Sequence, residues 1–158
     1  MRFGQTPPDS PAKQDFCQWM AAMKMLMLHS HDYWLKPYER NLENADPDAA
    51  IISCRDALVA LIHVERSDEE LPGTVTTKAL KNIKWLARKI GAKMIVLHSF
   101  AHLSTSRGEP EIAEQIIRNM ATRLAASGFA VQITPFGYFN EFKIHVAGPS
   151  LAKVFIDI

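Results

Sequence analysis

The sequence has little of what would place it among disulfide-bonded, zinc-binding or membrane proteins. Its 158 residues include only two cysteines, Cys17 and Cys54, which are far apart and form no metal-binding or redox spacing. We therefore expect reduced thiols in a cytoplasmic protein. No apolar run approaches the roughly 20 residues that cross a bilayer. Prolines near the N-terminus also interrupt the apolar core that a signal peptide needs.

An excess of charge of one sign is also absent. The chain has 18 lysines and arginines against 17 acidic residues, a net charge of +1. No field of the whole molecule draws it to nucleic acid or to a membrane, so any basic binding surface must be local. The length fits one domain. We expect residues 1–22 to be a flexible extension with at most one short helix, and residues 23–158 to be the domain, with Met23 as an alternative start.

The pattern of apolar residues predicts strands and two helices. The predicted strands are residues 23–28, 57–64, 93–97, 129–133, 142–146 and 154–158. The first helix is expected to begin at Thr76 as its N-cap and to stop at Gly91. The second is expected to begin at Pro110 and to end at Gly128. Strands alternating with helices indicate an α/β (α+β) single domain, with sheet layers flanked by two main helices.

The first predicted helix has a basic face. Its apolar residues recur at helical spacing and fall on the opposite side. The basic face carries no acidic residue and consists of Lys78, Lys81, Lys84, Trp85, Arg88 and Lys89. Such a face either is simply solvated or binds the phosphate groups of an RNA.

Polar residues gather where three of the predicted strands end. They are His29 and Ser30, residues 99–104, and residues 135–140. Open α/β sheets bind their ligands at strand ends. A histidine, several hydroxyls and backbone amides there could orient a water molecule and hold an ester carbonyl. A lone histidine at a strand end is also a common packing residue, so His102 has a catalytic and a structural interpretation.

Two other chemistries stay open at this point. A metal site would draw on His29, His31, Asp32, His98 and His102, although histidines two apart on a strand point to opposite sides. A serine nucleophile would pair Ser99 or Ser104 with His102, but no nucleophile-elbow pattern surrounds either serine.

Four segments together resemble a known family. They read LHS at residues 28–30, LVALIHVE at 58–65, FAHLS at 100–104 and PFGYF at 135–139. Their order and spacing resemble the amino-terminal editing domain of archaeal threonyl-tRNA synthetases, which has the fold of the D-aminoacyl-tRNA deacylases. The resemblance runs from Met23 to about Leu151. No synthetase catalytic or anticodon-binding domain accompanies it, so we expect a free-standing version.

The resemblance implies an enzyme that hydrolyses a carboxylic ester. The family removes a wrongly attached amino acid, typically serine, from the terminal ribose of threonine tRNA, and so proofreads translation. Serine and threonine differ by one methyl group, worth only about 1–3 kcal/mol in a pocket, so accurate charging needs a second selection step. The resemblance implies no cofactor and no metal, a homodimer, and a partner that is the 3′-terminal adenosine of an aminoacyl-tRNA.

The resemblance also implies roles for individual residues. Val64 and residues 99–102 would line the aminoacyl pocket. Phe136 and Tyr138 would hold the terminal adenosine, within the stretch Pro135, Phe136, Gly137, Tyr138 and Phe139. His29 and Ser30 would lie near the ribose.

Four positions depart from the family pattern. Phe139 and Asn140 stand where the family commonly has tyrosine and lysine, and Lys153 stands near the position of a family glutamate. Losing the lysine removes charge stabilisation beside the ester, which Lys153 would have to supply in a swapped arrangement. Ser99 replaces a common proline. The catalytic candidates are therefore His102, Asn140 and Lys153.

These departures separate three hypotheses about function. The first is trans-editing of a mischarged tRNA, seryl-tRNA(Thr) or one that carries a similar small or D-amino acid, with the basic helix face binding the tRNA. The second is a catalytically weakened module that binds a tRNA 3′ end or an aminoacyl nucleotide. The third is a metal-dependent hydrolase.

Overall fold

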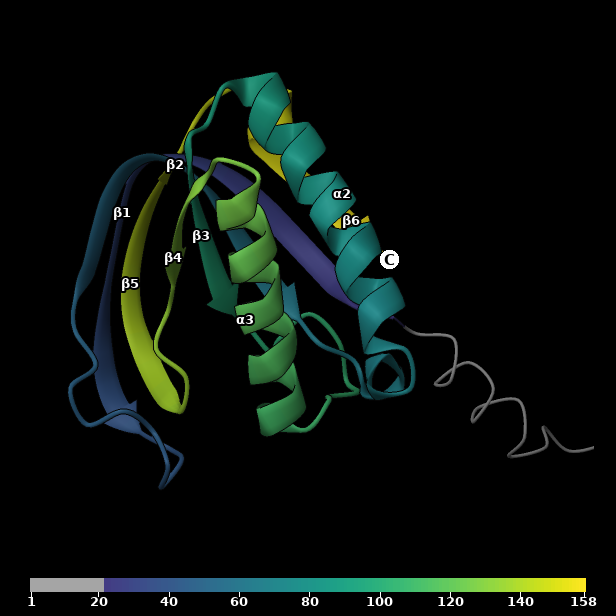
Figure 1. The fold of residues 1–158 in the computed structure, drawn as a ribbon. Helices are drawn as coiled ribbons and strands as arrows, with labels where there is room; N and C mark the ends of the chain where they lie inside the picture. Colours follow the sequence, from purple (N-terminus) through teal and green to yellow (C-terminus); the bar gives the residue numbers. More distant parts are fainter. Residues whose placement is uncertain (1–21) are drawn as a thin grey trace, which may run out of the picture.

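The computed structural model describes residues 22–158, in which six strands form one mixed sheet with two helices packed on one face (Figure 1). The strands are β1 (Lys24–Arg40), β2 (Ile52–His63), β3 (Met94–Ser99), β4 (Ala130–Ile133), β5 (Tyr138–Val146) and β6 (Lys153–Asp157). The helices are α2 (Pro72–Ile90) and α3 (Pro110–Ala126), with 3₁₀ turns η1 (Arg66–Glu69) and η2 (Ser150–Ala152). The predicted α/β fold class is confirmed.

β1 is the strand on which the sheet is assembled. The strand order is β4-β3-β2-β1-β5, and β6 also pairs with β1. β1 is antiparallel to β2, β5 and β6, whereas β2, β3 and β4 run parallel. It has 17 residues rather than the predicted six, because its polar second half stays paired with β2 on one side and β5 on the other.

The start of α2 differs from the prediction and its end does not. Thr76 is not the N-cap: the helix begins at Pro72, and the buried Thr76 hydroxyl donates to the Pro72 carbonyl at 2.7 Å. A proline suits the first helical position because its missing N–H would have no partner there. Gly91 ends the helix with φ of 70°, in the left-handed conformation expected of a glycine stop.

Two apolar clusters lie on opposite faces of the sheet. On the helix-covered face, Met25 and Met27 of β1 pack with Ile83 of α2 and Ile117 of α3. On the other face, Tyr33 and Leu35 of β1 pack with residues of β2, β3 and β5. Residues two apart on a strand normally share a face, so these four β1 residues should all point the same way.

Side chains along β1 alternate between the two faces of the sheet, and this alternation reverses at His31. Asp56 lies at the corresponding position of β2, between the residues that pair with Ser30 and Asp32. Asp56 has φ of 50°, and the pairing of β1 with β5 shifts between Ser30 and Asp32. Beyond this point the sheet bends. The Tyr33 hydroxyl therefore reaches Nδ1 of His98 on β3 at 2.9 Å, although β2 separates the two strands.

Some expectations fall outside the described residues. We expected a flexible extension over residues 1–22 and a reduced Cys17. Except for Ala22, these residues lie outside the part of the chain that the structure describes. In residues 22–158, no helix is long and apolar enough to cross a membrane.

The left-handed conformation of Asp56 gives a test of the bend. Asp56→Val should lower the free energy of unfolding by about 1–2 kcal/mol relative to Asp56→Asn, because a branched side chain is disfavoured in this conformation and asparagine tolerates it. Urea denaturation measures the difference. The side chain is 72% exposed, so lost packing does not account for the cost, and both variants are compared in a His29→Ala background because Asp56 is bonded to the His29 ring at 2.8 Å. Equal stability of the two variants would show that the bend imposes no backbone strain.

Candidate functional site

The segment that follows β3 carries the FAHLS residues and is fastened to the segment that follows β2. The Phe100 N–H donates to the Ile62 carbonyl at 2.8 Å, and the Gly108 N–H donates to the Val64 carbonyl at 2.9 Å. A Cβ atom at Gly108 would lie 3.0 Å from Cγ1 of Val64. Residues 100–108 therefore lie beside the end of β2 and Val64, and the printed contact of Val64 is with Gly108. We call residues 100–108 the candidate loop.

His63 fixes the middle of the candidate loop. Its fully buried ring accepts a hydrogen bond at Nδ1 from the Leu103 N–H at 3.1 Å, and Nε2 lies 2.5 Å from the Ser106 carbonyl. Because Nδ1 is an acceptor, Nε2 carries the hydrogen and donates, so the ring is neutral. The sequence predicts a structural or a surface histidine at position 63, and the structure shows a buried one. The feature of the sequence that could have indicated its buried role is its position at the end of an apolar strand.

Buried carboxyl groups lie beneath the same loop. Glu65 is fully buried, 3.3 Å from Nζ of Lys24 and 3.9 Å from Nε2 of His63. Asp68 accepts hydrogen bonds from the Met23 N–H at 3.1 Å and the Glu65 N–H at 2.8 Å. Burial raises the pKa of Asp68 to about 6. Asp68 thus has hydrogen-bond partners, whereas the buried Glu65 carboxylate has the Lys24 ion pair but no hydrogen-bond donor among the described residues.

An aromatic cluster positions the start of the candidate loop. The rings of His98 and Phe142 are 5.0 Å apart, and Phe100 packs at 5.8 Å from His98 and 4.9 Å from His102. Burial lowers the pKa of His98 to about 4, so at pH 7 its ring is neutral and accepts the Tyr33 hydroxyl. His102 is exposed, and Phe100 is half-buried.

The PFGYF segment leaves the sheet beside the candidate loop. The Thr134 N–H donates to the Leu97 carbonyl at 3.0 Å, so the carboxyl ends of β3 and β4 meet at one edge. Gly137 has φ of 78°, and a Cβ atom there would lie 2.7 Å from Cβ of Ala45. The Tyr138 hydroxyl donates to the Asp46 carbonyl at 2.5 Å. Residues 135–137 line a cavity of about 470 Å³ with α3 and residues 42–52, while Phe139 is exposed.

Asn140 lies on the same face of β5 as Phe142, because the two are two residues apart. Its Oδ1 atom is buried and has no hydrogen-bond partner among the described residues. A buried polar atom without a partner costs about 1–3 kcal/mol. Asn140 is therefore a candidate for contact with a ligand.

Within one chain, the structure separates Lys153, His29 and Ser30 from the candidate loop. Lys153 pairs with Leu28, whereas Asn140 pairs with Pro37, nine residues further along β1. The bend at His31 lies between these two pairing positions, so Lys153 and Asn140 are on different parts of the bent sheet. The Lys153 ammonium instead donates to the Ala147 carbonyl at 2.9 Å and the Gly148 carbonyl at 3.2 Å.

His29 and Ser30 also have local partners. The His29 ring is bonded to Asp56 at 2.8 Å, and the buried Ser30 hydroxyl donates to the Asp32 carbonyl at 2.6 Å. The residues considered as metal ligands are likewise divided: His29 and His31 lie at the bend, whereas His98 and His102 lie at the end of β3. In the described part of the chain, no three His, Cys, Asp or Glu side chains are grouped to hold a metal ion.

The basic residues predicted on the first helix lie together on its outer side. Lys78, Lys81, Arg88 and Lys89 are exposed, Lys84 is half-buried and Trp85 is 47% exposed. They are on α2, which leads into the amino end of β3, whereas the candidate loop follows the carboxyl end. The structure thus gives two separate candidate regions.

Comparisons with known proteins agree with the resemblance. The profile of the archaea-specific editing domain of threonyl-tRNA synthetase matches residues 23–158. Threonine–tRNA ligases of Methanosphaera stadtmanae and Methanoregula boonei are 34% and 35% identical over 134 residues, and that of Thermococcus kodakarensis is 33% identical over 135. Each match covers 84% of this chain and 22% of the ligase, so the chain spans about a fifth of the length of these relatives.

A solved structure gives a further match of the fold alone. The c-Myc DNA unwinding element binding protein superposes with a TM-score of 0.58 at 10% identity, over 85% of this chain and 98% of that chain.

The two hydrogen bonds of His63 predict a specific loss. His63→Leu should lower the free energy of unfolding by about 1–3 kcal/mol and speed hydrogen exchange of the Leu103 amide, because two backbone groups of the candidate loop lose their partner. His145→Leu, which alters an exposed histidine, serves as the control and should change stability by less than about 0.5 kcal/mol. Unchanged exchange at Leu103 in His63→Leu would show that other contacts hold the loop.

The low pKa of His98 predicts how stability depends on pH. Between about pH 4 and pH 6.5 the unfolded chain binds a proton at this residue that the folded chain does not. Stability should therefore fall by up to about 3 kcal/mol as pH decreases through this window. Subtracting the pH profile of His98→Gln from that of the unmodified protein isolates this contribution from the opposite one of Asp68. Parallel profiles would mean that His98 titrates normally.

Proposed function

Because the chain belongs to the family of archaea-specific editing domains of threonyl-tRNA synthetase, we propose that it hydrolyses the ester of a wrongly charged aminoacyl-tRNA. The preferred substrate in this proposal is seryl-tRNA(Thr), or a tRNA that carries a similar small or D-amino acid. The observation that carries the proposal is that the family match spans the whole described domain, including the candidate loop and Asn140.

The chemistry needs a water molecule and a place for negative charge. Water adds to the ester carbonyl carbon, the carbonyl oxygen becomes an oxyanion, and the ribose hydroxyl leaves with a proton. Backbone N–H groups fixed before the reaction stabilise an oxyanion effectively. The candidate loop is suited to this role because bonds from Ile62, His63 and Val64 hold its backbone in place. No cofactor enters this mechanism.

Selection of the amino acid is assigned to the start of the candidate loop. Phe100 and Ala101 are half-buried and Val64 is buried beside Gly108, and in this proposal these apolar side chains face the side chain of the amino acid. The exposed ring of His102 is free to move a proton or to orient the water molecule. Phe136 and Tyr138 are proposed to hold the terminal adenosine at the neighbouring edge of the sheet.

The residue at position 140 bears on whether the domain is an enzyme or only binds the tRNA end. A neutral amide supplies a donor and an acceptor but no positive charge, so it orients a substrate better than it stabilises an oxyanion. Its unpartnered oxygen supports contact with a substrate N–H or hydroxyl group. If the missing cation is essential, the domain binds the aminoacylated tRNA end without hydrolysing it. Lys153, held on carbonyl groups at the other end of β1, does not supply this charge within one chain.

Single-turnover deacylation tests the proposal. After EDTA treatment, the protein should release serine from seryl-tRNA(Thr) about 10- to 200-fold faster than threonine from threonyl-tRNA(Thr), the range that one methyl group provides. A D-aminoacyl-tRNA is assayed alongside. His102→Ala should slow release at least tenfold, an order-of-magnitude expectation for a group that transfers a proton. His145→Ala, which alters an exposed histidine elsewhere, should not.

The same assay decides among the alternatives. No release above the spontaneous rate, with tRNA still bound, would contradict the enzyme and favour the binding module. Recovered activity in Asn140→Lys would then identify the cause. Activity that EDTA removes and zinc restores would indicate the metal-dependent hydrolase. The homodimer implied by the resemblance and the cytoplasmic location expected from the cysteines remain predictions; light scattering and fractionation of the native host test them.

A further inference from the structure

A basic groove lies between the outer sides of α2 and α3, away from the candidate loop. It encloses a cavity of about 580 Å³. The residues that define it are Lys81, Lys84, Trp85, Arg88 and Lys89 of α2 and Arg123 of α3. None of the described residues that line it is acidic. Five positive groups thus share one hollow in a chain whose net charge is only +1.

Interactions within the chain do not account for this charge. Arg123 donates from Nη1 to the Thr77 hydroxyl at 3.3 Å, which holds its guanidinium over the groove without neutralising it. The ion pairs among the described residues involve none of the groove cations. A helix C-terminus favours positive side chains in its last turn, which explains Arg88 and Lys89 but not Lys81 or Lys84.

Trp85 indicates the kind of partner. It is 47% exposed and lies one helical turn from Lys81 and from Arg88, so its ring and these cations face the same space. Cations alone would suit any acidic surface. A flat aromatic ring among them suits nucleic acid, because an unpaired base stacks on it with about 1–3 kcal/mol while the cations contact phosphates.

We propose that the basic groove holds the RNA strand of the substrate, with an unpaired base stacked on Trp85. The inference rests on the proposed function for the identity of the RNA, but not for the binding itself. The groove extends along α2 from Thr77 to Lys89 near the amino end of β3, whereas the candidate loop follows the carboxyl end of β3. The groove therefore contacts nucleotides several positions from the ester.

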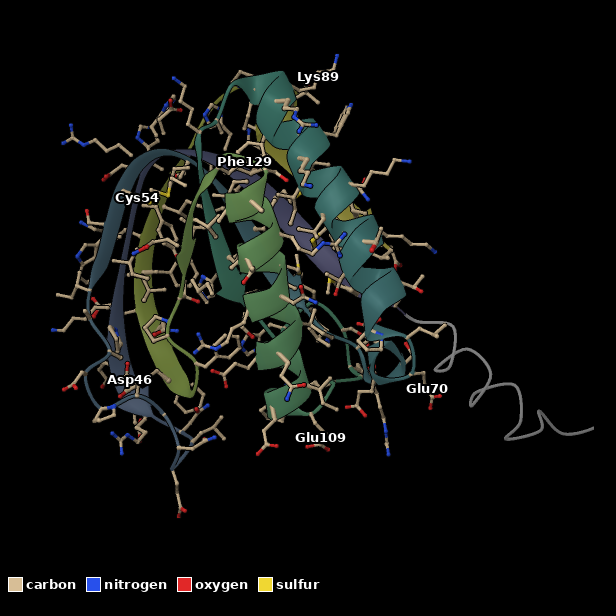
Figure 2. All side chains as sticks on the ribbon, viewed as in Figure 1. Asp46, Cys54, Glu70, Lys89, Glu109 and Phe129 are labelled. Atoms are coloured by element: carbon tan, nitrogen blue, oxygen red, sulfur yellow. The ribbon has the colours of Figure 1, made fainter. Side chains whose placement is uncertain are left out.

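The distribution of charge along the helices agrees with this placement. Figure 2 shows Lys89 at one end of α2 and Glu70 near the other, with Glu109 at the start of α3. Phosphates are attracted to the basic groove, whereas near the candidate loop Glu70 and Glu109 are mixed with Arg66 and Arg107, so the charge of one sign is concentrated in the groove.

Binding of a fluorescein-labelled, uncharged tRNA(Thr) transcript to the full chain tests the inference by anisotropy. Lys81→Glu/Arg88→Glu should weaken binding at least tenfold at about 0.1 M salt and reduce the slope of log K against log salt by about 1.4, since two phosphate contacts are lost. Lys36→Glu/Arg55→Glu changes the net charge equally at exposed strand positions outside the groove and should leave binding unchanged. Thermal unfolding confirms that each variant is folded.

Trp85 is tested separately. Trp85→Ala should weaken binding about tenfold, and Trp85→Phe should retain most of the affinity because the ring still stacks. Equal losses in the two double variants would attribute binding to net charge and overturn the inference, as would unchanged binding in Lys81→Glu/Arg88→Glu. Equal binding of tRNA and polyglutamate, insensitive to Trp85→Ala, would identify an acidic protein partner instead. Because the transcript carries no amino acid, a failure of deacylation leaves this readout intact.

Discussion

The reversal of strand alternation at His31 and Asp56 is the constraint on which the rest of the structure depends. It lets one long strand contribute to two apolar clusters on opposite faces of the sheet. Before the reversal, β1 packs against the helices; after it, β1 bends so that Tyr33 reaches His98. Without the bend, the aromatic residues of β1 and β5 would not meet the end of β3, and Phe100 would lack its packing partners.

The candidate loop illustrates how a site outside regular structure can be held in place. Residues 100–108 form no strand or helix, yet their backbone is bonded to Ile62, His63 and Val64. A buried polar layer of Glu65 and Asp68 lies beneath these contacts and is itself bonded to the start of β1. The rigidity that an oxyanion-binding site needs thus comes from polar groups buried where the strands end.

The two candidate regions lie apart, the loop at the carboxyl end of β3 and the basic groove along α2 and α3, and this separation fits a substrate much larger than the bond to be broken. The candidate loop and Asn140 offer mostly neutral donors, acceptors and an aromatic wall, whereas the basic groove offers five cations and one stacking surface. A small ester would use only the first region. In the function we propose, an RNA that carries the ester at its end uses both regions, with charge as the main source of affinity and the loop as the source of selectivity.

The amino-acid sequence by itself determined the fold class, the six strands, the two helices and the motifs FAHLS and PFGYF. These features follow from apolar periodicity and local residue chemistry, which act over a few neighbouring residues. Only the tertiary structure decided the length of β1, the role of His63 and the separation of Lys153 from Asn140. These depend on pairing between residues distant in the chain and on one left-handed residue, Asp56, which no short sequence window reveals. Arg123 shows the same limit, because it joins the residues of α2 only when α3 packs beside them.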